Sequence, residues 1–232
     1  KCLRIIHNKN TAPSSLLNGQ GEVNKVCEPM IIMHGLGWKQ SGYTSHENGL
    51  CLIFRLSDGR FIVVDGGFNR EKDADDLYKL LKNNTPSGMD TVIAAWFITH
   101  AHGDHHATFT SAFTKYRSSV KVENVIFNPP LGGVYSSDKD EGGGWVTLIS
   151  TIPAYRANYI RPHVGDRYYI GDAVIDMLYT VDYQYPQVFS YYNTSSLIFS
   201  VKLAGQRIMV TGDGANTSFD INVNRIRKHK EW

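Results

Sequence analysis

The chain has few cysteines, almost no excess of charge and no long apolar run, and each absence excludes a class of protein. Its three cysteines, Cys2, Cys27 and Cys51, are too few and too widely spaced for a disulfide framework. This favours a reducing compartment, the cytoplasm. The net charge of +2 gives no global argument for nucleic-acid binding. No apolar run reaches the roughly 20 residues of a membrane-spanning helix, so we expect no membrane segment in this chain.

Size and composition are those of a globular protein with one large domain or two small ones. The chain has 232 residues, of which 42% are hydrophobic and 20% charged. Residues 1–28 are polar and predict a lead-in segment, loosely ordered or the remnant of an upstream region. Residues 29–232 form the predicted domain. Because the chain starts at Lys1 and residues 225–232 resemble a basic helix without a stop signal, we expect both ends to be cuts.

Three strand-turn-strand patterns occur in the domain. In the first, residues 50–56 and 61–64 flank Asp58-Gly59, and this dipeptide supplies the positive-φ positions of a tight hairpin turn. The other two hairpins are predicted at 167–170 with 173–179, and at 196–203 with 207–210.

Helices and buried strands alternate between the first hairpin and the later ones. We expect helices over residues 71–84, 104–116 and 147–159, the last shortened by Pro153, and strands over 91–98 and 120–127. The order is therefore strand-rich, then helix, strand, helix and strand, then strand-rich again. This order predicts an α/β protein with two β-sheets sandwiched between helices.

A dense group of metal-ligand side chains follows the buried strand over 91–98. Residues 100–106 contain four of the nine histidines. If the chain leaves the strand still extended, His100 and His102 project from the same side. Asp104 and His105 then fall in the following turn, close enough to reach the same metal or a second one. Imidazole and carboxylate suit zinc and its neighbours, so we predict a metal site; the alternative is an accidental histidine-rich surface loop.

The motifs around this group resemble those of the metallo-β-lactamase superfamily. Residues 61–67 resemble its first motif, and residues 99–105 match its HxHxDH motif. Residues 211–213, Thr-Gly-Asp, resemble its later metal-bridging aspartate. Residues 193–199, before a hairpin, are most similar to the DNA-uptake competence-protein branch. The resemblance covers residues 30–215 and implies the four-layer αβ/βα sandwich of that superfamily.

The resemblance also implies a site with one or two divalent metal ions, zinc with manganese as the alternative. Asp65 is expected behind the ligands, holding a ligand histidine by a hydrogen bond, with a plain Asp-Gly turn as the alternative. Asp213 is expected to bridge two cations, with a turn aspartate as the alternative. His106 is expected to be a bystander. The predicted metal ligands are His100, His102, Asp104, His105 and Asp213.

Two departures from the superfamily pattern reduce this ligand set. Many members carry a further ligand histidine where this chain has residues 191–195, which contain none. The last histidine of the family would lie beyond Trp232, so we expect a C-terminally truncated domain that lacks its final helix, strand and loop. His163 could replace a missing ligand, but a surface-loop position is favoured because it precedes a hairpin.

The function implied is that of a metal-dependent hydrolase. The ions would lower the pKa of water to near neutrality and generate hydroxide, while Asp104 or Asp213 orients that nucleophile and takes up a proton. The competence-branch resemblance favours a phosphodiester substrate over another small molecule. Two alternatives remain: an amide, lactone or thioester hydrolase with the same site, and a non-catalytic module stabilised by metal. Nucleic acid as a partner would require affinity that falls steeply with salt.

Overall fold

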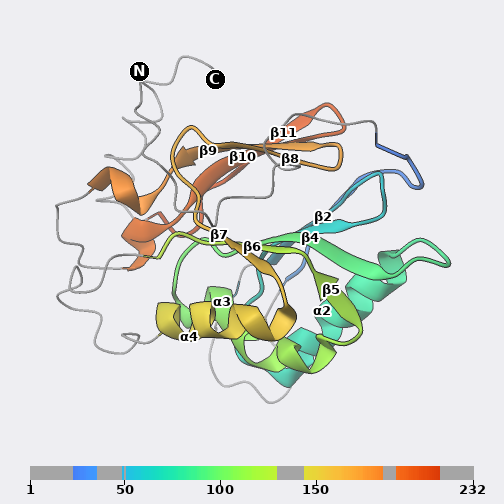
Figure 1. Ribbon diagram of the computed structural model, residues 1–232, viewed down its shortest axis with the longest axis horizontal. Coiled ribbons are helices and arrows are strands. Elements are labelled where there is room, and N and C mark those ends of the chain that lie inside the picture. The colour runs from blue at the N-terminus through green and yellow to red at the C-terminus, as the bar shows by residue number, and fades with distance from the viewer. Residues whose placement is uncertain (1–22, 36–48, 50, 130–143, 185–191, 215–232) are drawn as a thin grey trace.

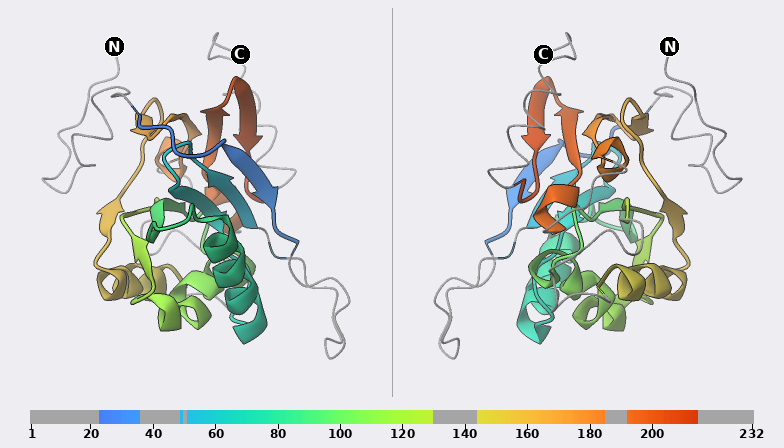
Figure 2. Two further views of the ribbon diagram at one scale, coloured as in Figure 1. Left: turned by 90° about the vertical axis from the view of Figure 1, so that its right-hand side faces the viewer. Right: turned by 90° about the vertical axis from the view of Figure 1, so that its left-hand side faces the viewer.

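Two β-sheets pack face to face, and helices cover the outer face of the larger one (Figures 1 and 2). The computed structural model describes residues 23–35, 49, 51–129, 144–184 and 192–214. The larger sheet has seven strands in the order β1-β2-β3-β4-β6-β7, with β5 also paired to β4. The smaller sheet has four strands in the order β11-β10-β9-β8. The predicted α/β class with two packed sheets is confirmed.

The elements have the following bounds. The larger sheet contains β1 (Met30–Met33), β2 (Cys51–Arg55), β3 (Phe61–Asp65), β4 (Thr91–Phe97), β5 (Val120–Val122), β6 (Asn124–Ile126) and β7 (Asn158–Ile160). The smaller sheet contains β8 (Arg167–Ile170), β9 (Ala173–Tyr179), β10 (Ile198–Leu203) and β11 (Gln206–Val210). The helices are α2 (Glu71–Asn84), α3 (Gly103–Thr110) and α4 (Gly144–Thr151), with short 3₁₀ turns η1 (Ala112–Tyr116), η2 (Ile152–Tyr155), η3 (Val181–Gln184) and η4 (Tyr192–Ser195).

The middle of the larger sheet is parallel, and this arrangement positions the candidate site. Strand β4 pairs in parallel with β3 on one side and with β6 on the other, and β6 pairs in parallel with β7. The carboxyl ends of these strands therefore meet at one edge. Asp65, the last residue of β3, and His100, three residues after β4, both lie at this edge.

Strand β4 is held from both faces by aromatic side chains. Trp96 packs edge-on against Phe109 of α3 and Phe113 of η1, with ring centroids 4.9 and 5.2 Å apart. The next residue, Phe97, points the other way and stacks on Phe199 of β10 at 4.7 Å. Side chains alternate along a strand, so these neighbours fill the two halves of the core. The strand that leads to the histidine group is thus fixed between helices and smaller sheet.

The three predicted hairpins and the first predicted helix are confirmed. Strands β2 and β3, β8 and β9, and β10 and β11 are antiparallel pairs. Helix α2 has the predicted bounds and buries Leu77 and Leu81. It ends before Thr85, whose side chain donates to the carbonyl of Leu81 at 2.9 Å. Pro86 follows and cannot continue a helix.

The predicted helix over 104–116 is wrong in its second half. Helix α3 ends at Thr110, and the chain continues as the 3₁₀ turn η1. Ser111 lies between them with φ −131° and ψ −83°, outside the helical region. The Thr110 hydroxyl donates to the carbonyl of His106 at 3.3 Å. Such local side-chain bonds compete with a regular helix, which is consistent with the break at this point.

The predicted strand over 120–127 is interrupted, because Glu123 separates β5 from β6 although both pair with β4. The predicted helix over 147–159 is wrong at both ends. Helix α4 begins earlier, at Gly144, and gives way to the 3₁₀ turn η2, which carries Pro153. Arg156 then adopts a left-handed φ of 55° and ends the turn. The following residues form β7, which pairs with β6.

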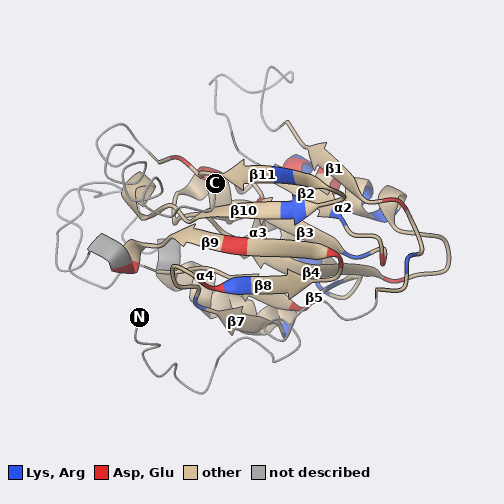
Figure 3. Cartoon of the chain, turned by 90° about the horizontal axis from the view of Figure 1, so that it is seen from above, with Lys and Arg blue, Asp and Glu red and all other residues tan. Residues whose placement is uncertain are grey.

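Each of the four strands of the smaller sheet contains a charged residue, as Figure 3 shows from above. Arg167 of β8 and Asp176 of β9 form an ion pair there. The helix predicted over 225–232 lies outside the described residues, as do residues 1–22 of the predicted lead-in, which include Cys2. Cys27 and Cys51 are free thiols. Within the described ranges, none of the helices is long and apolar enough to span a membrane.

Candidate metal centre

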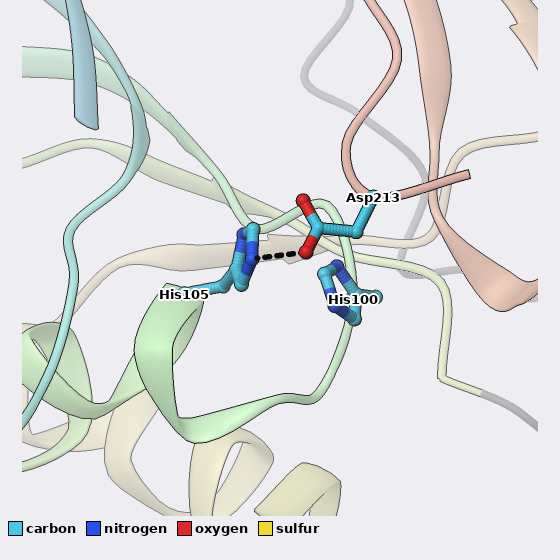
Figure 4. Close-up of side chains that lie close together, drawn as sticks. All are labelled: His100, His105 and Asp213. Carbon is cyan, nitrogen blue, oxygen red and sulfur yellow. Dashed lines mark ion pairs between the residues drawn. The ribbon is translucent and has the colours of Figure 1, made fainter. Parts of the chain in front are cut away.

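Three side chains from distant parts of the chain meet at the carboxyl edge of the parallel strands. His100 follows β4, His105 lies on the first turn of α3, and Asp213 follows β11 (Figure 4). Each offers one ligand atom, and these atoms all lie within 4.8 Å of one another. Nε2 of His105 is 3.3 Å from Oδ2 of Asp213. Both imidazoles are buried, whereas 43% of the Asp213 side chain is exposed, so the group is reachable from one side.

Asp65 supports this group from behind. It is fully buried and has a positive φ of 55°, which turns the chain sharply at the end of β3. Its Oδ1 accepts from the backbone N–H of Thr99 at 2.7 Å, and its Oδ2 accepts from the Thr99 hydroxyl at 2.8 Å. Oδ2 also lies 2.8 Å from Nδ1 of His105. A carboxylate with three such contacts fixes the ring of His105.

These contacts define which nitrogen of each histidine faces the site. Because Asp65 can only accept, Nδ1 of His105 carries the proton and Nε2 is directed to Asp213. The Thr99 hydroxyl gives its proton to Asp65, so its oxygen accepts from Nδ1 of His100 at 3.0 Å. Nε2 of His100 is then the atom that offers a lone pair. Anchoring Nδ1 on a protein acceptor is the usual way in which a metal-binding imidazole is oriented.

The donor atoms fall into two neighbouring groups. In the first, Nε2 of His100 lies 2.9 Å from Nδ1 of His102. In the second, Nε2 of His105 lies 3.3 Å from Asp213 Oδ2 and 3.7 Å from Asp104 Oδ2. The rings of His100 and His105 are 4.1 Å apart, so the groups adjoin. Of the five predicted ligands, His100, His105 and Asp213 form one mutual group, while His102 lies beside His100 and Asp104 beside His105. Their roles as ligands remain predictions.

The electrostatics of the two groups differ. Burial, and then the neighbouring imidazoles, hold the pKa of His100 well below its usual range, so this ring is neutral. Burial also opposes charge on His105, but the carboxylates of Asp65 and Asp213 outweigh it and raise the pKa to about 10. The hydrogen bond from His105 in turn lowers the pKa of Asp213. The second group therefore favours positive charge between His105 and Asp213, which is where a cation would sit.

The residues present fit a divalent cation. Imidazole nitrogens and carboxylate oxygens are the donors that zinc, manganese and iron accept. In addition, Oδ1 of Asn193, on η4, is a buried oxygen without a hydrogen-bond partner. Such an atom is costly unless something satisfies it. Sequence reasoning noted only that this segment lacks a histidine and did not identify Asn193.

Gly212 lets the end of β11 approach the site closely. It has a positive φ of 54°, and a Cβ there would lie 2.8 Å from the Ser196 side chain and 3.0 Å from that of Thr99. The Ser196 hydroxyl accepts from the backbone N–H of Asp213 at 3.2 Å. Sequence reasoning did not identify Thr99 or Ser196, because Thr99 bonds to Asp65 and Ser196 to Asp213, both far away along the chain.

His106 and His163, which the sequence predicts to be a bystander and a surface-loop residue, lie outside the two donor groups. His106 is buried, its Nδ1 is 3.3 Å from Thr110 Oγ1, and burial lowers its pKa to about 4. Nδ1 of His163 lies 2.8 Å from Oδ2 of Asp182. Arg161 also contacts this carboxylate, at 2.8 Å. Neither histidine is among the grouped donors of the described residues.

A cleft of about 450 Å³ opens beside the second donor group. One wall is polar, with His105 and Asp213, and the other is apolar. No lysine or arginine is among the described residues that line it. These lining residues are Gly49, Leu52, His105, Met209, Val210, Thr211, Gly212 and Asp213. The volume suits a small molecule or the reactive end of a larger one.

Comparison with known proteins gives matches among solved structures alone, since no family and no curated protein matches this sequence. The metallo-beta-lactamase fold protein YhfI from Bacillus subtilis is 13% identical over 73% of this chain and 57% of its own, with a TM-score of 0.43. A metallo-beta-lactamase from Cronobacter sakazakii is 13% identical over 87% and 74%, with a TM-score of 0.43. Zinc-bound PqqB from Methylobacterium extorquens is 7% identical over 70% and 52%, with a TM-score of 0.41. At these values we draw no functional conclusion from them.

Proposed function

We propose that the chain is a metal-dependent hydrolase of the metallo-β-lactamase superfamily. The observation that carries the proposal is the pair of adjoining donor groups, in which Asp65 and Thr99 hold two imidazoles with Nε2 directed into the site. A structural metal site is closed by its ligands, whereas a catalytic one keeps an open position. The partial exposure of Asp104 and Asp213, and the cleft beside Asp213, support the catalytic alternative.

We assign the holding of metal to His100, His102, Asp104, His105 and Asp213. One or two divalent ions, zinc with manganese as the alternative, would lower the pKa of water and polarise the scissile bond of the substrate. Asp213 is ionised at neutral pH because its pKa is lowered, so it can accept a hydrogen bond from the attacking water. Asp104 offers a second carboxylate that can accept a hydrogen bond from the attacking water. Asp65 keeps His105 oriented throughout.

A phosphodiester is the first candidate substrate. It rests on the similarity of residues 193–199 to the competence-protein branch. Carboxylic substrates, namely amides, lactones and thioesters, are the second candidate. The apolar wall of Leu52, Met209 and Val210, with no described lysine or arginine in the cleft lining, favours them, because a phosphodiester in a cleft is usually met by cationic side chains.

The test is hydrolysis by the purified chain, supplied with zinc or manganese, of a panel containing a phosphodiester, a lactone, a thioester and a β-lactam. We expect metal-dependent turnover that a chelator abolishes and that Asp213→Asn reduces strongly. Turnover of carboxylic substrates alone would refute the phosphodiester assignment. Metal binding with no turnover in any arm would instead identify a non-catalytic module. Binding of single-stranded DNA that weakens steeply with salt would identify nucleic acid as the partner.

A further inference from the structure

The cleft beside the metal centre continues past its apolar wall onto strand β1. Leu52 of β2 lines the cleft, and its cross-strand neighbour on β1 is Met33. Directly opposite residues of antiparallel strands point to the same face, with Cβ atoms about 5 Å apart. Ile31 lies two residues before Met33 and therefore faces the same side. We call Ile31, Met33 and Leu52 the apolar shelf.

The outer part of this shelf is exposed although it is apolar. The exposed fraction is 77% for Met33 and 43% for Ile31, whereas Phe54, which pairs with Ile31, is fully buried. The difference arises at the edge of the sandwich, because the smaller sheet ends at β11 and β1 extends past it (Figure 3). An exposed apolar surface that adjoins a cleft is typical of a binding site.

The charge of the cleft is confined to its metal-centre end. Apart from His105 and Asp213, the described residues that line it are uncharged, and Met209 and Val210 face the opening opposite the shelf. Met209 is 44% exposed. Strand β1 has the sequence Met-Ile-Ile-Met and contains no charged residue. The cleft is therefore polar where the reacting group of a substrate would lie and apolar towards the shelf. This arrangement fits a molecule with a polar head and an apolar tail.

The shape of the shelf indicates the form of that tail. Met33 lies about 5 Å across the sheet from Leu52, and Ile31 lies about 7 Å further along β1. The shelf is thus a single row of side chains that leads away from the cleft. A narrow, elongated surface of this kind matches an unbranched chain better than a fused ring system. Because the shelf is continuous with the cleft, its occupant belongs to the same molecule as the reacting group.

We propose that Met33 and Ile31 determine the specificity of the hydrolase by binding an unbranched apolar chain attached to the scissile group. The inference rests on the proposed function, but it holds for either type of scissile bond. Each methylene that the shelf covers should raise kcat/KM by about two- to fourfold, the upper value corresponding to complete burial. The contact is remote from the reacting atoms and is the same in the ground state and the transition state. The gain should therefore appear mainly as a lower KM.

The test measures kcat/KM for acyl thioesters and alkyl phosphodiesters with chains of two to twelve carbons, in the presence of zinc or manganese. In the series that is hydrolysed, wild-type kcat/KM should rise with chain length. Met33→Gln keeps the length of the side chain and Ile31→Thr keeps its branching. Each should lower kcat/KM for the longest chain by about tenfold, and the loss should grow with chain length. Met33→Leu, which keeps the apolar surface, should retain the wild-type dependence.

Met89→Gln is the matched control. Met89 is 38% exposed and lies two residues before β4, at the opposite end of that strand from His100, so this variant should follow the wild type. Unfolding temperatures in chelator show which variants fold, and either shelf variant alone suffices for the test. Turnover that does not depend on chain length, or depends on it equally in all folded variants, would overturn the inference and leave the proposed function intact. Absence of turnover by the wild type in both series and at every length would overturn both.

Discussion

Asp65→Asn should destabilise the protein strongly although it changes only one atom. The carboxylate accepts from the Thr99 N–H at 2.7 Å, from its hydroxyl at 2.8 Å and from Nδ1 of His105 at 2.8 Å. An amide has one accepting oxygen, so its NH₂ group must face at least one of these donors. The site is fully buried, and His105 carries a proton that Asp65 stabilises. Breaking a buried charge pair from one side costs about 3–5 kcal/mol.

Urea unfolding of the chelator-treated protein at pH 7 measures this loss. A change of that size lowers the unfolding temperature by roughly 6–20 °C for a chain of this length. Asp76→Asn is the matched control, because Asp76 pairs with Lys72 on the exposed face of α2 and should contribute less than about 1 kcal/mol. In metal-containing buffer, Asp65→Asn should also weaken metal binding about 10- to 100-fold. A loss no greater than that of the control would refute the assignment of Asp65 as the support of His105.

Three further predictions concern individual side chains. The pKa of His105 is about 10 in the folded protein and 6.5 in the unfolded chain. The stability that its proton contributes without metal is therefore complete below pH 6.5 and is lost as the pH rises through 10. Urea unfolding in chelator over a range of pH should show this loss, and His105→Gln should remove the pH dependence. Gly212→Ala should cost more stability than Gly205→Ala in thermal unfolding, because both positions have positive φ but a Cβ meets neighbouring atoms only at Gly212; equal losses would contradict this. His106→Gln should leave the number of bound ions unchanged, and loss of an ion would make His106 a ligand.

Local signals were sufficient for the elements that the chain forms by itself. The Asp58-Gly59 turn predicts the β2–β3 hairpin, and the spacing of Leu77 and Leu81 predicts α2. Sequence patterns failed where contacts with residues far away in the chain determine the local structure. Residues 158 and 159 end the predicted helix but belong to β7, because β6 offers them a parallel edge.

Some residues of the candidate site could likewise be predicted from the local sequence, and others could not. His100, His102, Asp104 and His105 lie within six positions, so their spacing alone predicts that they converge. Asp213 reaches them from the other sheet, and only the resemblance to a known superfamily indicated it. The hydroxyl of Thr99 and the amide of Asn193 could not be assigned from the sequence, because their surroundings depend on how η4 and β10 pack against the end of β4.

The most direct test of the account is the metal content of the purified chain after exposure to zinc or manganese and removal of free ions, measured by elemental analysis. The account predicts at least one divalent ion per chain in the wild type. It also predicts loss of that ion in the double variant His100→Gln, His105→Gln, while His106→Gln retains it. Equal metal content in the wild type and the double variant would contradict the central claim that these histidines form a metal centre.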